Sequence, residues 1–150
     1  MNGFRSIALG IIATGLLCLV GAPAAYAKKN VKLKVAVVHA STSAGSVDKG
    51  ISKRMAKSLK TAFGRFKSFS LVSKDALKLS KGKKSVLKLP TSESAVITYN
   101  GKSKRKHRLT LSIPKHKVKM ELSAPAKKLF YQAGIRHDKG ILILAFYLKE

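Results

Sequence analysis

Hydrophobic and polar residues alternate where the lysine-rich part of the chain begins. From Val31 to Val38, apolar side chains at odd positions are separated by lysine, alanine or valine. A period of two is typical of a β-strand that buries one face. We therefore predict a first strand over residues 31–38.

A period of three to four residues follows and predicts one amphipathic helix. Ser46 is expected to cap this helix and Asp48 to lie in its first turn, where a carboxylate complements the helix dipole. Gly64 is a natural end for the helix. The apolar positions that recur at helical spacing are Val47, Ile51, Met55, Leu59 and Ala62.

The period returns to two after Gly64 and predicts short strands joined by turns. Residues 77–79 are expected to form a hairpin with 87–89, and Asn100-Gly101 is the strongest turn signal in the chain. Residues 141–148 are continuously apolar and too short to span a membrane, which predicts a central strand covered on both faces. The other predicted strands are 69–71, 95–99, 109–113, 118–122 and 129–135, with a turn at 137–140.

These segregated elements predict an α+β fold. The N-terminal strand and one basic amphipathic helix are expected to pack on an antiparallel β-meander, as a sandwich or a partly closed barrel. About 120 residues suffice for one hydrophobic core. We therefore expect one small basic domain over residues 28–150.

The first 27 residues have the composition of an export signal. Arg5 precedes an uncharged apolar stretch from Ile7 to Val20, and Ala25-Tyr26-Ala27 is the small-x-small pattern that a signal peptidase recognises. We predict a signal peptide over residues 1–27, cleaved between Ala27 and Lys28. The protein is then expected to be periplasmic or extracellular.

Two features favour the alternative of an uncleaved membrane anchor. Residues 6–27 carry no charge, and about 20 apolar residues are enough to span a bilayer. The lysines that begin at Lys28 outnumber the positive charges before the apolar stretch, which favours retention of the body in the cytoplasm. The basic domain would in that case lie near cytoplasmic nucleic acid.

Charge dominates the composition. Of 31 basic side chains only Arg5 precedes the predicted cleavage site, so 30 stand against six acidic ones in the predicted mature chain, a net charge of +24. Such a charge predicts attraction to polyanions that weakens steeply with salt. Most of these side chains are lysine, a hydrated point charge, which favours diffuse attraction over shaped recognition.

Two clusters of basic residues are candidates for binding an anionic polymer or membrane surface. The first is a charge block in or near a predicted hairpin, and the second is the polar face of the predicted helix. Solvated surface charge is the alternative explanation of both. The block contributes Lys102, Lys104, Arg105, Lys106 and Arg108, and the helix contributes Lys53, Arg54, Lys57 and Lys60.

The sequence offers little for catalysis or for a cofactor. Its one cysteine, Cys18, lies in the leader, and the six carboxylates are scattered. No histidine pair has metal-ligand spacing, and no Gly-x-Ser-x-Gly motif is present. We therefore expect no catalytic residues, no metal and no cofactor.

The sequence thus predicts an exported, non-enzymatic, lysine-rich protein that associates electrostatically with an anionic envelope component. Nucleic acid is a further candidate partner, which would be bound without sequence specificity. The alternative is an accessory or scaffold subunit of an envelope assembly that binds an acidic protein through a sheet edge or residues 129–135. In that case the charge steers the encounter and apolar surface holds the complex.

Overall fold

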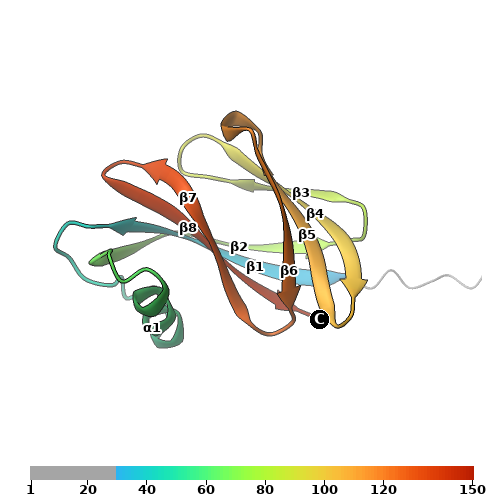
Figure 1. Ribbon diagram of the computed structural model, residues 1–150, viewed down its shortest axis with the longest axis horizontal. Coiled ribbons are helices and arrows are strands. Elements are labelled where there is room, and N and C mark those ends of the chain that lie inside the picture. The colour runs from blue at the N-terminus through green and yellow to red at the C-terminus, as the bar shows by residue number, and fades with distance from the viewer. Residues whose placement is uncertain (1–29) are drawn as a thin grey trace, which may run out of the picture.

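Two four-stranded antiparallel sheets form most of the protein (Figure 1). The computed structural model describes residues 30–150, so the predicted signal peptide and its cleavage site lie outside the described residues. Sheet A has the order β2-β1-β8-β7, and sheet B has the order β3-β4-β5-β6. The elements are β1 (Val31–Ser41), α1 (Lys53–Ala62), β2 (Ser68–Leu79), β3 (Lys84–Lys88), β4 (Ser94–Ser103), β5 (Lys106–Ile113), η1 (Pro114–His116), β6 (Val118–Pro125), β7 (Leu129–His137) and β8 (Gly140–Lys149).

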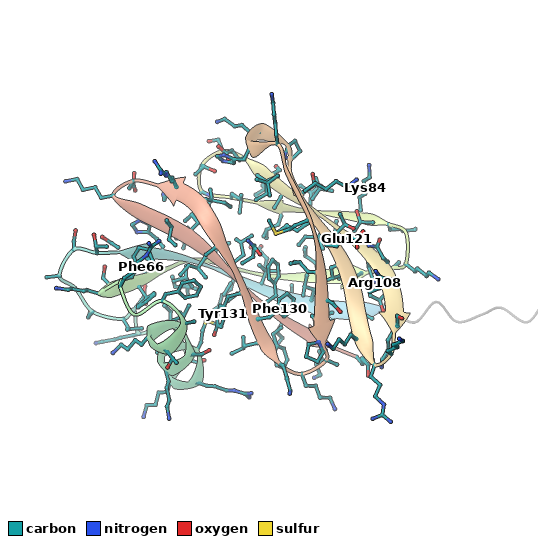
Figure 2. The ribbon with its side chains drawn as sticks, viewed as in Figure 1. Phe66, Lys84, Arg108, Glu121, Phe130 and Tyr131 are labelled. Carbon is teal, nitrogen blue, oxygen red and sulfur yellow. The ribbon has the colours of Figure 1, made fainter. Side chains whose placement is uncertain are left out.

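The main hydrophobic core lies between the two sheets. Leu33 of β1 and Leu144 of β8 are fully buried in it, together with Ile97 of β4 and Leu111 of β5. The Phe130 ring of β7 stacks on that of Phe146 with centroids 5.1 Å apart, and Figure 2 shows Phe130 on the β7 segment nearest β6. The alternation of each strand therefore supplies one apolar face to this core.

A second, smaller core lies between α1 and the opposite face of sheet A. Leu59 of the helix and Ile143 of β8 are both fully buried in it, and Met55 packs against them. Neighbouring residues of β8 thus face different cores, because side chains alternate across a strand. The prediction that residues 141–148 form a central strand is confirmed. Helix α1 covers the outer face of this strand at Ile143, whereas Ala145 and Tyr147 line a groove on the same face.

The predicted start of the helix was wrong. The cap is Ser52, whose side chain accepts a hydrogen bond from the Met55 backbone N–H at 3.3 Å, and the helix begins at Lys53. Residues 46–51 are instead a loop that is held to β2, because Asp48 accepts hydrogen bonds from the backbone N–H groups of Gly50 and Leu71. Four of the apolar residues predicted for the helix still pack in the core against sheet A. Met55 and Leu59 do so from α1, whereas Val47 and Ile51 do so from this loop.

The predicted hairpin between residues 77–79 and 87–89 was also wrong. Leu77 and Leu79 lie opposite β1, whereas Leu87 lies opposite Ala95 of β4. The chain passes from sheet A to sheet B between β2 and β3, and Gly82 in this connection has a φ of 77°. The predicted segments 69–71 and 77–79 are parts of the single strand β2, so alternation found extended backbone but gave neither the length of this strand nor its partner.

The turn between β4 and β5 lies four residues beyond the predicted one. Ser103 pairs with Lys106, so Lys104 and Arg105 form a two-residue turn with φ values of 46° and 67°. Asn100 and Gly101 lie instead at a register shift within the hairpin, where Gly101 has a φ of 100°. The glycine is used for a β-bulge, which also favours positive φ.

The observed arrangement is mainly antiparallel sheet with one α-helix among residues 30–150, compatible with both the α+β class and a β-sandwich. The predicted meander covers only β3 to β6, since the chain returns to sheet A for β7 and β8. No helix in the described part of the chain has the length and apolar character of a membrane span.

Candidate functional site

Three lysines form a row across the outer face of sheet A, the face turned away from sheet B. Lys32 of β1 lies directly opposite Lys78 of β2 on one side and Lys149 of β8 on the other. All three are exposed. Residues directly opposite in an antiparallel pair project from the same face, so the three ammonium groups share one surface. We call Lys78, Lys32 and Lys149 the lysine row.

Like charges directly opposite each other destabilise a sheet, so the lysine row lowers the stability of sheet A. No carboxylate compensates for it: among residues 30–150, no ion pair involves a member of the row. The acidic side chains have other partners, such as Glu150 with Lys102 and Glu121 with Arg108. Unneutralised charge held at a cost in stability is typical of a binding surface.

A groove with a volume of about 550 Å³ adjoins the lysine row on the same face. The side chains of its floor are small, because Ala36 and Ala145 lie opposite each other on the two central strands. Helix α1 covers the other half of this face, where Val38 and Ile143 pack beneath it. The residues that line the groove are Lys34, Val35, Ala36, Ser52, Arg54, Met55, Lys74, Asp75, Ala76, Leu129, Ala145 and Tyr147.

The groove combines an apolar interior with a basic rim. Met55, Leu129 and Tyr147 stand beside the alanine floor, and the rim carries Lys34 and Arg54. Two further rim residues are Lys74, whose Nζ donates to the Gly50 carbonyl oxygen at 2.6 Å, and Asp75, the one carboxylate among the lining residues.

The N-terminal end of α1 adds to the positive potential of the groove. Ser52 and Arg54, at the start of the helix, both line it. The positive end of the helix dipole therefore lies at the rim. Of the helix residues predicted to bind anions, Lys53, Lys57 and Lys60 are exposed on α1, whereas Arg54 alone also lines the groove.

The predicted charge block lies on the β4–β5 hairpin, and Figure 1 shows this hairpin near the C-terminus and far from α1. The structure therefore does not unite the two predicted clusters. Lys104 and Arg105 form the exposed turn and Lys106 follows it. The remaining two are paired, Lys102 with Glu150 and Arg108 with Glu121, and Figure 2 shows the second pair on neighbouring strands of sheet B.

Sequence reasoning missed the lysine row and the Lys34 position beside it. The alternation of Lys32 and Lys34 with apolar residues was visible and indicated a basic strand face. The other two members lie 46 and 117 positions further along the chain, at Lys78 and Lys149. Only the register of β1 against both neighbours brings them together.

A buried polar cluster lies just behind the β4–β5 turn, where His107 pairs with Lys102. His107 is 1% exposed; its Nδ1 lies 2.9 Å from the Tyr99 hydroxyl and its Nε2 lies 3.1 Å from Glu150 Oε1. Lys102 also donates to that carboxylate oxygen. Residues of this cluster line a cavity of about 380 Å³ together with Asn30, Val31, Lys81 and Gly101.

The proton positions in this cluster follow from the carboxylate. The hydrogen bond from Lys102 lowers the pKa of Glu150, and His107 adds to this effect although burial opposes it. The ionised carboxylate can only accept, so we assign the Nε2 proton to His107 and let Nδ1 accept from Tyr99. Burial raises the pKa of the Tyr99 phenol, which agrees with its role as donor. Both ring nitrogens of His107 are thereby engaged within the protein.

A second carboxylate is held between basic side chains at the opposite end of sheet B's strands. Glu93 lies 3.1 Å from Lys115 Nζ and 2.7 Å from His116 Nε2. Burial acts to raise the pKa of Glu93, but the hydrogen bonds and charges of these two partners outweigh it and lower the pKa. This cluster ties the β3–β4 turn to η1. Within residues 30–150, no group of three or more histidine, cysteine or acidic side chains is placed to hold a metal ion.

Comparison with known proteins assigns neither a family nor a function to the chain. No protein-family model, curated protein or solved structure matches the chain. We therefore infer a function from the sequence and from the arrangement of the side chains.

Proposed function

We propose that this is an exported, non-enzymatic protein that binds an anionic envelope component, and that the outer face of sheet A is its contact surface. The observation that carries the proposal is the lysine row, in which Lys32 faces Lys78 and Lys149 without a neutralising carboxylate in the described chain. A bound polyanion would relieve the repulsion within the row, so binding and stability would be coupled.

The spacing of the row suits a ligand with several negative charges. Neighbouring strands lie about 4.8 Å apart, so the three lysines span about 10 Å across the sheet. Lys34 lies two residues along β1 from Lys32, which places it about 7 Å away on the same face. Lysine attracts such a ligand as a mobile point charge, so we expect several anionic polymers to bind with affinities that depend strongly on salt.

The exposed tip of the β4–β5 hairpin is a second contact in this proposal. Lys104, Arg105 and Lys106 are exposed and make no ion pair within residues 30–150. Their hairpin meets sheet A where Lys102 contacts Glu150, the residue next to Lys149. A long polyanion could therefore contact both the row and the hairpin.

Heparin chromatography with matched variants tests the proposal. Lys32→Gln/Lys78→Gln/Lys149→Gln removes the row, and Lys84→Gln/Lys88→Gln/Lys119→Gln removes the same charge from sheet B. We expect the first variant to elute at clearly lower salt than the second, and its log–log salt slope to fall by about three. Equal elution of the two variants would show that binding depends on net charge alone.

The export part of the proposal has its own test. Amino-terminal sequencing of the protein isolated from its native cells should begin at Lys28. An intact leader would instead support the anchored, cytoplasmic alternative, in which nucleic acid is the available polyanion.

One observation favours the second candidate, a subunit that binds a protein partner. β7 is an edge of sheet A, as the hypothesis for residues 129–135 requires. A cavity of about 260 Å³ beside β6 and β7 is lined by the apolar side chains of Val118, Met120 and Ile135 together with the polar ones of His116 and Gln132. A partner recovered from envelope extract in high salt, and lost on Met120→Lys, would support this candidate over a polyanion.

A further inference from the structure

We propose that the groove on sheet A binds the alkyl chain of an anionic lipid, whose phosphate head contacts Lys34 and the lysine row. This inference rests on the proposed function, because it names one ligand class for the same face. The lipid proposal also gives the apolar interior of the groove a role in binding, whereas a purely electrostatic contact would not use it.

The interior of the groove has the character of a site for hydrocarbon. Ala36 and Ala145 form a floor without polar side-chain atoms, and Met55, Leu129 and Tyr147 supply apolar walls. Its volume of about 550 Å³ lies within the range of about 300–1,000 Å³ that is typical of small-molecule sites. An alkyl chain laid on this floor would remove apolar surface from water on both partners.

The rim supplies the complementary charge for the head group. Lys34 lines the groove on the side of the lysine row, and Arg54 lines it beside the start of α1, where the positive end of the helix dipole lies. Lys34 is exposed, and its neighbour across β1–β8 is Tyr147, which borders the groove. Asp75 opposes the binding of an anion, but the rim retains an excess of positive charge through Lys34, Arg54 and Lys74.

The order of these features along the face favours a lipid over a hydrophilic polymer. Helix α1, the apolar groove and the lysine row follow one another along β1, with Val38 under the helix, Ala36 in the groove and Lys32 in the row. A molecule that spans groove and row must be apolar at one end and anionic at the other. A hydrated polymer would gain nothing from the alanine floor.

Calorimetric titration with single-chain probes tests this directly. The probes are dodecyl phosphate, butyl phosphate and dodecyl maltoside, each used below the concentration at which it forms micelles. A fully buried methylene strengthens association by a factor of about four. We therefore expect dodecyl phosphate to bind at least about tenfold more tightly than butyl phosphate, and more tightly than the uncharged maltoside.

Groove-filling variants locate the chain. Ala76 is exposed on the edge strand β2 and lines the groove, so Ala76→Leu is expected to fold. Ala36→Leu fills the floor itself. The matched control is Ser112→Leu on the outer face of sheet B, which adds the same kind of side chain far from the groove. We expect Ala76→Leu and Ala36→Leu to weaken dodecyl phosphate binding about tenfold or more, and Ser112→Leu to leave it unchanged.

The outcomes separate this inference from the proposed function. If the groove variants retain heparin binding but lose dodecyl phosphate, both proposals stand. If they bind dodecyl phosphate as the unaltered protein does, or if butyl phosphate binds equally well, the groove inference is overturned while the lysine row is unaffected. Methyl NMR signals of Ala36, Ala76 and Met55 should shift with dodecyl phosphate, and unchanged signals would also overturn it.

Discussion

Two tyrosine hydroxyls differ in whether they have a hydrogen-bond partner. The Tyr99 hydroxyl lies 2.9 Å from His107 Nδ1, whereas the buried Tyr131 hydroxyl has no partner in the described chain. Tyr131 packs edge-on against Phe63 of the helix segment, with ring centroids 6.0 Å apart. An unsatisfied buried polar group lowers stability. The native protein already has such a group at Tyr131, whereas at His107 one would arise only if the Tyr99 hydroxyl were removed.

The two Tyr→Phe variants are expected to change stability in opposite directions. Tyr99→Phe leaves His107 Nδ1 buried without a donor and should lower the free energy of unfolding by about 1–3 kcal/mol. Tyr131→Phe removes an unpartnered hydroxyl and should leave stability unchanged or raise it by up to about 1 kcal/mol. Urea denaturation of both variants measures this difference. A large loss of stability in Tyr131→Phe would mean that its hydroxyl has a partner.

The carboxylate of Glu150 should make stability depend on pH. Its pKa is lowered in the folded protein by Lys102 and His107 from the ordinary value of 4.5. A group with a lowered folded pKa stabilises the protein above its unfolded pKa, and this contribution is lost as pH falls through the folded value. Glu150→Gln should therefore lower the melting temperature at pH 7, and the difference from the unaltered protein should shrink below about pH 4.5.

Glu93 is the matched control for this titration. Its pKa is also lowered, by Lys115 and His116, so the Glu150→Gln variant should retain the acid sensitivity that Glu93 causes. The doubly substituted Glu93→Gln/Glu150→Gln protein should show the smallest dependence on acid. A difference between Glu150→Gln and the unaltered protein that stays constant from pH 3 to pH 7 would contradict the assigned hydrogen bonds.

At the residue scale, the sequence predicted which side chains are exposed better than it predicted which side chains form hydrogen bonds with each other. Lys106 and Arg108 are exposed as expected, yet His107 between them is buried. Strand alternation explains this, because β5 extends further toward the charge block than expected and includes His107 on its inner face. Its partners, Tyr99 and Glu150, come from β4 and from beyond β8, so sequence proximity gave no indication of the cluster.

At the element scale, the β4–β5 turn contains residues that do not favour its conformation. Lys104 and Arg105 both have positive φ, which costs side chains other than glycine, asparagine and aspartate about 1–2 kcal/mol each. Asn-Gly is the preferred pair in such two-residue turns. Lys104→Asn/Arg105→Gly should therefore raise the free energy of unfolding by about 1–2 kcal/mol.

A charge-matched variant separates backbone strain from repulsion in this turn. Lys104→Gln/Arg105→Gln removes the same two charges but retains the strained backbone, so it should stabilise the protein less. Thermal unfolding of both variants makes the comparison. If the Asn-Gly variant is less stable than the unaltered protein, the turn lies elsewhere in the hairpin.

Element positions were largely predictable because alternation is local, whereas pairing is not. The strand over 109–113 was predicted from alternation and that over 141–148 from a continuous apolar run, and both are present, as is the predicted strand over 129–135. The start of α1 was missed because both Ser46 and Ser52 can cap a helix, and a tertiary contact decides between them: the Asp48 carboxylate holds its loop to Leu71 of β2. The groove was unpredictable for a similar reason, since it exists where α1 leaves part of sheet A uncovered.

At the scale of the whole molecule, salt should stabilise the protein. Neighbouring members of the lysine row stand on strands about 4.8 Å apart, a spacing below the screening length of about 10 Å in 0.1 M salt and above that of about 3 Å in 1 M salt. The row variant Lys32→Gln/Lys78→Gln/Lys149→Gln should melt at a higher temperature than the unaltered protein in low salt. The two should converge near 1 M sodium chloride.

Each directly opposed lysine pair lowers the free energy of unfolding by about 0.2–1 kcal/mol. The row variant should therefore gain about 1 kcal/mol in the free energy of unfolding in low salt. The sheet B variant Lys84→Gln/Lys88→Gln/Lys119→Gln carries the same net charge and should gain less. A variant that is more stable and binds heparin less well would show that the row is retained for binding. Identical melting temperatures in low salt would remove the stability argument for the row.

The pairing of β1 with β8 has a consequence for the time at which the chain can fold. Lys32 lies opposite Lys149, so the central pair of sheet A joins segments more than a hundred positions apart. A ribosome that has not yet translated residues 140–149 carries a chain whose first strand lacks one of its two neighbours. Closing so long a loop is slow compared with forming local hairpins. The nascent chain should therefore stay open during synthesis, and a translocase that accepts only unfolded polypeptide would have that interval in which to engage it.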